Sequence, residues 1–199
     1  VRDSLVHFGD ISREISGEGR ELHITLTPRT DKTTSGEPRF DLFLAADNSS
    51  FTYDAKAFES IGIRAKAAVD ELGADVESVD ITSPVGTIAV NGRVDNWNSP
   101  RYTANITSTA DLTQISTTLE TATAIRGVGN FKGTLTGEGE QFKIEGVVDS
   151  ESLRADGVYV KGVNIEGTVA GTNEDYEANG KVIAEMLTYD DLRIDLLRA

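Results

Sequence analysis

Alternation of apolar and polar side chains, with a period of two residues, constrains this chain more than any other feature. In residues 131–148, FKGTLTGEGEQFKIEGVV, Phe131 and Leu135 share one face of a segment, and the glycine-rich turn GEGE follows them. The apolar face of the returning segment carries Phe142, Ile144 and Val148. This pattern predicts a half-buried antiparallel hairpin, with one apolar and one solvated face.

The same alternation recurs along most of the chain. In residues 85–97, 101–110, 162–171 and 176–182 it places on one face Ile88, Val90, Val94, Tyr102, Ile106, Val163, Ile165, Val169 and Val182. Residues 1–77 contain strand-like runs with less regular patterning, and residues 30–38 are predicted to form a flexible loop. Residues 111–122 differ, because Leu112, Ile115 and Leu119 have the spacing of a short amphipathic helix, with Asp111 as its N-cap.

The hairpin is repeated after 34 residues. Gly133, Gly137, Phe142 and Gly146 correspond to Gly167, Gly171, Tyr176 and Gly180, and a looser copy begins at Gly92. Repeats of this length are typical of stacked supersecondary units. We therefore predict a mainly β fold, a long curved antiparallel meander sheet with one short helix. It is expected to be a single β domain over residues 1–199, cut from a longer repeat protein, with irregular strands and a loop in 1–77 and repeated hairpins in 78–199.

The repeated glycines lie on the apolar face, where a packed core would need side chains. Glycine inside a strand marks a bend, a bulge or the close approach of another group. Two interpretations follow. The glycines allow tight corners in a closed sandwich or barrel, or they let an open sheet curl into an apolar trough.

Composition argues against several classes of function. The net charge of −14 disfavours nucleic acid, which is bound through Lys and Arg. The chain has no cysteine and two histidines, so neither a zinc site nor a nucleophilic triad is expected, and no cofactor or metal is predicted. The acidic turns 137–140 and 173–177 lack the ligand spacing of a calcium loop. Trp97, the only tryptophan, is predicted to cap a sheet edge. These observations favour a protein that is not an enzyme.

Residues 81–97, 102–116 and 126–171 resemble repeats of the TamB/AsmA-like proteins of diderm bacterial envelopes. Members of that family are anchored in the inner membrane and cross the periplasm as a U-shaped β-sheet with an apolar inner face. They are implicated in moving phospholipid to the outer membrane or in assembling outer-membrane proteins. The resemblance therefore implies a periplasmic segment whose anchor lies outside this sequence. The partners it implies are phospholipid acyl chains, and also an outer-membrane β-barrel protein or unfolded outer-membrane polypeptides.

Two hypotheses of function follow. In the first, acyl chains lie along an open groove formed by Ile88, Val90, Val94, Tyr102, Ile106, Phe131, Leu135, Phe142, Ile144, Val148, Val163, Ile165, Val169 and Val182. In the second, the chain is a closed β-sandwich that serves as an adhesin or carbohydrate-binding module, with its function in the loops and at Trp97. An open groove must leave a large apolar surface exposed, whereas a closed core must not.

Overall fold

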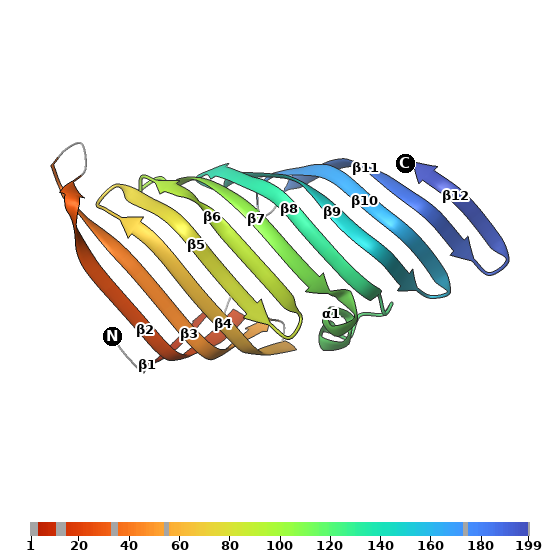
Figure 1. Cartoon of the computed structure of the whole chain (residues 1–199), viewed down its shortest axis with the longest axis horizontal. Coiled ribbons are helices and arrows are strands. Elements are labelled where there is room, and N and C mark those ends of the chain that lie inside the picture. Colours follow the sequence, from red (N-terminus) through yellow and green to blue (C-terminus); the bar gives the residue numbers. More distant parts are fainter. Residues whose placement is uncertain (1–3, 11–14, 33–35, 54–55, 173–174, 199) are drawn as a thin grey trace. The chain divides into compact units, whose positions relative to one another are not determined.

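The computed structural model describes residues 4–10, 15–32, 36–53, 56–172 and 175–198. In these ranges the chain forms an open antiparallel meander, in which the order of the strands in the sheet is their order in the sequence (Figure 1). The strands are β1 (Ser4–Asp10), β2 (Ile15–Lys32), β3 (Pro38–Tyr53), β4 (Lys56–Val69), β5 (Gly73–Ser83), β6 (Gly86–Asp95), β7 (Arg101–Asp111), β8 (Arg126–Glu138), β9 (Gln141–Ala155), β10 (Val158–Gly171), β11 (Tyr176–Tyr189) and β12 (Leu192–Arg198), and α1 (Leu112–Leu119) is the helix. The predicted fold class is confirmed, and the closed core is wrong because the sheet is open.

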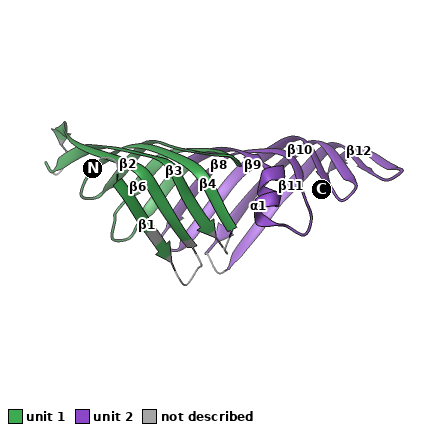
Figure 2. Cartoon of the chain, turned by 90° about the horizontal axis from the view of Figure 1, so that it is seen from below, with its two compact units in different colours: residues 1–104 green, residues 105–199 purple. Residues whose placement is uncertain are grey.

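The chain divides into two compact units, residues 1–104 and 105–199 (Figure 2). In the described part of the first unit, successive strands pair from β1 with β2 to β5 with β6, and each of these pairings contains a shift of register. Residues 1–77 therefore contain long paired strands. Their interruptions are β-bulges, which explains the irregular sequence pattern.

In the second unit, the strand register aligns the 34-residue repeat across β8, β9, β10 and β11. Residues directly opposite one another in adjacent strands share a face of the sheet. One row of such residues is Phe131, Val148, Ile165 and Val182, the next is Gly133, Gly146, Gly167 and Gly180, and the third is Leu135, Ile144, Val169 and Ala178. We call the second of these the glycine row. The repeat thus places two apolar rows on either side of one row without side chains.

The first unit has apolar rows of its own across β2 to β6. They are Ile24, Leu44, Ala65, Val79 and Val90; Leu26, Leu42, Ala67, Val76 and Gly92; and, from β3 to β6, Ala46, Ile63, Ile81 and Ile88. The opposite face carries polar rows such as Thr27, Asp41, Ala68, Asp75 and Arg93. One side of the sheet in this unit is therefore mainly apolar and the other mainly polar.

The apolar residues do not form a closed core. Among the described residues the buried hydrophobic side chains are Ala46, Ala74, Val163 and Ala184. The accessible surface is 13092 Å², whereas a compact domain of 21.4 kDa would expose about 9,100 Å² and two compact domains of half that mass about 11,000 Å². Large side chains of the apolar rows, among them Leu26, Ile88 and Ile165, contribute to this area because they are exposed to solvent.

Helix α1 begins at the predicted N-cap. The Oδ1 atom of Asp111 accepts hydrogen bonds from the backbone N–H groups of Thr113 (2.9 Å) and Gln114 (3.1 Å), and its Oδ2 atom accepts one from the Gln114 side chain (3.0 Å). These bonds, that from the Gln114 side chain most of all, lower the pKa of Asp111. The helix ends at Leu119, three residues before the predicted end, because Glu120 adopts a left-handed conformation with φ 51° and caps it.

Two further predictions are refined by the structure. The loop predicted at 30–38 is shorter, since β2 continues to Lys32 and β3 begins at Pro38; residues 33–35 lie outside the described residues. Trp97 fastens a turn, because its Nε1–H donates to the backbone carbonyl of Asp70 at 3.1 Å. The carboxylate of Asp70 in turn accepts from the N–H groups of Leu72 and Gly73.

Candidate functional site

The apolar face of the second unit is partly exposed along its rows. Ile165, in the first row, is 36% exposed, and Phe131, Val148 and Val182 of the same row are half-buried. Val163 lies on β10 opposite Ser150 and is buried, so its side chain is less accessible than that of Ile165. An aliphatic group that lies against the first row would therefore contact side chains that are already partly exposed to solvent.

The glycine row has a side chain over it at Gly133 and Gly146, whereas at Gly167 and Gly180 the nearest neighbours are backbone atoms. A Cβ atom on Gly133 would lie 2.5 Å from Cζ of Phe131, and one on Gly146 would lie 2.5 Å from Cε2 of the same ring. The Phe131 ring therefore occupies the space that side chains at these two positions would need. At Gly167 and Gly180 the nearest atoms to such a Cβ are backbone atoms of the neighbouring strand, with no side-chain atom among them.

The first unit contains an apolar cavity of about 580 Å³ that sequence reasoning missed. This volume is within the range of about 300–1,000 Å³ that is usual for sites of small molecules. Strands β1 to β5 line it with Val6, Glu18, Gly19, Leu22, Leu44, Ala46, Ser49, Ser50, Phe51, Phe58, Ile61, Ile63, Ile81 and Ser83. Phe51 and Phe58 lie opposite one another, with ring centroids 6.5 Å apart. The runs FLAA and IGIRAKAAV were the available signal in the sequence.

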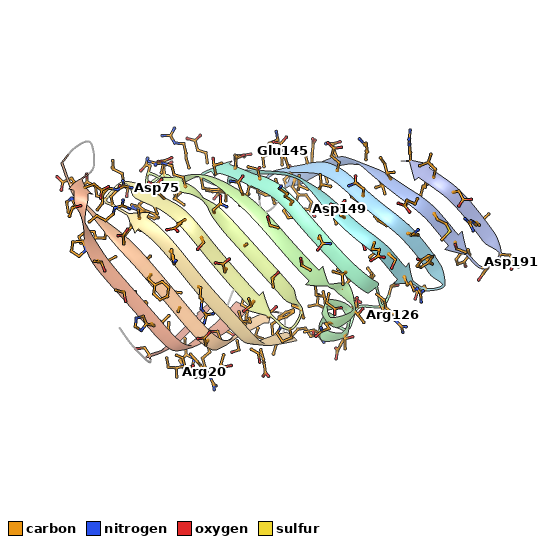
Figure 3. The ribbon with its side chains drawn as sticks, viewed as in Figure 1. Arg20, Asp75, Arg126, Glu145, Asp149 and Asp191 are labelled. Atoms are coloured by element: carbon orange, nitrogen blue, oxygen red, sulfur yellow. The ribbon has the colours of Figure 1, made fainter. Side chains whose placement is uncertain are left out.

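Charged groups are found at the border of this cavity and at the other end of the strands. Glu18 pairs with Arg20 and lies 3.3 Å from Nδ1 of His7. Figure 3 places Arg20 and Asp75 toward opposite ends of the strands of the first unit. The cavity is thus apolar inside and has an ion-paired carboxylate at its border.

A ladder of ion pairs covers the polar face of the first unit near Asp75. The guanidinium of Arg39 lies 2.7 Å from Asp75, 3.5 Å from Asp31 and 3.5 Å from Asp70. Arg93 pairs with Asp95 at 2.6 Å and with Asp75 at 2.7 Å, and these bonds raise the pKa of Arg93. Each exposed pair of this kind contributes little to stability. Together they make this face hydrophilic, so the two faces of the unit contrast strongly.

The structure places the predicted groove residues unit by unit. In the first unit, Ile88 and Val90 lie in its apolar rows, opposite Ile81 and Val79. Val94 lies opposite Ala74, in a further row that continues to Val69 and Phe40, and Tyr102 is half-buried on β7. In the second unit, Ile106 is half-buried on β7, and the rows contain Phe131, Leu135, Ile144, Val148, Ile165, Val169 and Val182. Phe142 lies opposite Gly137 and Gly171.

Two buried serines, one in each unit, differ in whether their hydroxyl groups form hydrogen bonds. Ser49, at the cavity, is 4% exposed, and its Oγ has no hydrogen-bond partner in the described part of the chain. Ser150 is 5% exposed and donates to the Val128 carbonyl at 2.7 Å. A buried polar group without a partner costs free energy, whereas a bonded one stabilises the fold.

We therefore expect the same substitution to have different effects on the melting temperature at the two positions. Ser150→Ala should lower the melting temperature by about 2–4 °C, corresponding to about 1 kcal/mol for a chain of this size. Ser49→Ala should leave it unchanged or raise it, because the substitution removes a hydroxyl that bonds to nothing. Thermal unfolding followed by circular dichroism measures both. Equal losses in the two variants would mean that Ser49 has a partner in solution.

Other candidate sites have little support. Within the described ranges, no three His, Asp or Glu side chains are grouped so that they could hold a metal ion. Of the acidic turn at 173–177, Asn173 and Glu174 lie outside the described residues. None of the described helical residues forms a helix long and apolar enough to cross a membrane.

No family model, curated protein or solved structure matches this chain.

Proposed function

We propose that this chain is a non-enzymatic segment of a lipid conduit, whose apolar face shelters the acyl chains of phospholipids. The observation that carries the proposal is an open sheet with continuous apolar rows on one face and few buried hydrophobic side chains among its described residues. A soluble protein seldom leaves such a surface uncovered unless something binds to it.

The energetics suit a cargo that slides along the face. Burial of apolar surface contributes about 25 cal/mol per Å² and does not depend on the direction of contact. An acyl chain can therefore be attracted by either apolar row with no specific hydrogen bond. The ion pairs of the opposite face, such as those of Arg39 and Arg93, keep that side in water.

The resemblance to TamB/AsmA-like repeats supports a cellular setting for this activity. We propose that the segment belongs to a protein anchored in the inner membrane and that it lies in the periplasm, between the inner and outer membranes. A role in assembling outer-membrane proteins uses the same face, since unfolded membrane strands also carry apolar side chains on one side.

Photo-crosslinking tests the proposal in cells. A photoreactive amino acid at Leu135 or Val169 is expected to label phospholipid, because both residues lie in one apolar row. The same probe at Thr134 or Thr168, which lie on the opposite face, is the matched control and should remain unlabelled. Mass spectrometry of the adducts identifies the cargo. Equal labelling from both faces would refute a conduit, and peptide adducts alone would assign the face to outer-membrane polypeptides.

A further inference from the structure

Two arginines lie directly opposite one another at the start of β8 and the end of β9. The register pairs Arg126 with Arg154, and Arg154 with Tyr159 of β10. Like charges placed opposite one another in a sheet destabilise it. The chain has 33 acidic residues, so a carboxylate partner would be the common solution. Neither arginine forms an ion pair with any described residue.

The surroundings hold these side chains around a small hollow. Both arginines border a cavity of about 360 Å³, together with Asp156, Gly157 and Tyr159. The guanidinium carbon of Arg154 lies 5.0 Å from the centre of the Tyr159 ring, a stacked arrangement that restricts its orientation. Figure 3 shows Arg126 beside the short helix, where β8 begins.

A tight turn closes the other side of the hollow. Asp156 and Gly157 have φ values of 45° and 82°, as in a two-residue hairpin turn that requires positive φ at both positions. The Asp156 carboxylate also borders the hollow, but its Oδ2 atom accepts a hydrogen bond from the Thr123 hydroxyl at 2.9 Å. This bond orients the carboxylate toward Thr123, and no ion pair among the described residues joins it to Arg126 or Arg154.

We propose that Arg126 and Arg154 form a binding site for a phosphate group. Guanidinium groups bind phosphate oxygens through paired, charge-assisted N–H···O bonds, and two of them can hold one tetrahedral anion. Binding would turn the unfavourable cross-strand pair into a favourable one. The assignment of this phosphate to a phospholipid headgroup rests on the proposed function, whereas the phosphate site itself does not.

The whole chain can be titrated with two soluble probes, sn-glycerol 3-phosphate and dihexanoyl phosphatidylglycerol, by calorimetry at low salt. We expect Arg126→Gln and Arg154→Gln each to weaken both by at least about tenfold, the usual effect of losing a charge-assisted hydrogen bond. Arg193→Gln is the matched control, because Arg193 pairs with Asp195 at 2.9 Å, and it should bind like the wild type. Without phosphate, Arg126→Gln should melt at the same or a higher temperature than the wild type, which separates lost binding from lost folding.

The outcomes test the phosphate site separately from its assignment to a phospholipid headgroup. Tighter binding of the lipid than of glycerol phosphate supports a headgroup, and equal binding supports a site for free phosphate esters. Wild-type protein that binds neither probe, or Gln variants that bind both as well as the wild type, overturns the proposal. Labelling from Leu135 is a different measurement on residues remote from this hollow in the strand register, so failure here leaves the conduit standing, and the reverse also holds.

Discussion

Leu135→Asp and Ile165→Asp are each expected to abolish lipid retention while the protein stays folded. Both side chains lie in apolar rows of the second unit. Ile165 is 36% exposed, so a carboxylate at that position keeps part of its hydration and costs less than one in a closed core. An acyl chain lying against the row would have to strip that hydration. Each 1.4 kcal/mol of this cost lowers affinity tenfold, so retained lipid should fall by at least about tenfold.

The controls are Thr134→Asp and Thr168→Asp, which add the same charge on the other face. Lipid retained by the purified chain, quantified by mass spectrometry, and thermal unfolding are measured for all four variants. In cells, the two apolar-face variants should not replace the wild-type sequence in function. A large fall in melting temperature for both would show that these residues are packed like a core. Unchanged lipid content in folded variants would count against the conduit.

Gly133→Ala is expected to destabilise the second unit strongly, whereas Gly129→Ala on the same strand is not. At Gly133 the new Cβ would meet the carbonyl oxygen of Glu145 and lie 2.5 Å from the Phe131 ring. The backbone of β9 would have to move, and the ring would have to leave its place over the glycine row. Overpacking of this kind costs about 1–3 kcal/mol.

Gly129 is the matched control, since its nearest neighbour would be Cδ1 of Leu112 at 3.8 Å, an ordinary contact. Its replacement by Ala should change stability by no more than about 0.5 kcal/mol. Chemical denaturation with both variants and the wild type measures the difference. Similar stabilities for the two variants would mean that β8 and β9 can move apart at Gly133 without cost. The close approach of their backbones at the glycine row would then have no structural role.

The repeated hairpins could be predicted from the sequence because no bulge interrupts their alternation. Phe131 and Val148 were assigned to one face by their parity, and the register pairs them. The spacing of 34 residues also predicted that Gly133 and Gly167 are equivalent, and both lie in the glycine row. The position of the Phe131 ring over Gly133 and Gly146 could not be predicted, since it depends on a side-chain conformation.

The cavity of the first unit was missed for a physical reason. On β3, Leu44 and Ala46 line the cavity from even-numbered positions, and Ser49 and Phe51 line it from odd-numbered ones. The register shifts between Ala46 and Ser49 and again between Ser49 and Phe51, and Asn48, within the first shift, has φ 53°. A bulge adds one residue to the strand and reverses its parity. A search for a period of two residues therefore assigns the residues after the bulge to the wrong face of the sheet. The pairing of Arg126 with Arg154 was hidden for a related reason, because it requires the register of two strands.

The row of Phe131, Val148, Ile165 and Val182 has a kinetic consequence. Neighbouring strands lie about 4.8 Å apart, so the row offers a similar apolar contact at each such step across β8 to β11. An aliphatic chain lying across the strands has methylene groups at a much shorter spacing, and the two periods do not match. When one group loses contact with a side chain, another gains it, so the total contact energy changes little with position. Friction along such a row would be low, and a bound chain could be held firmly against the sheet while it moves easily along it.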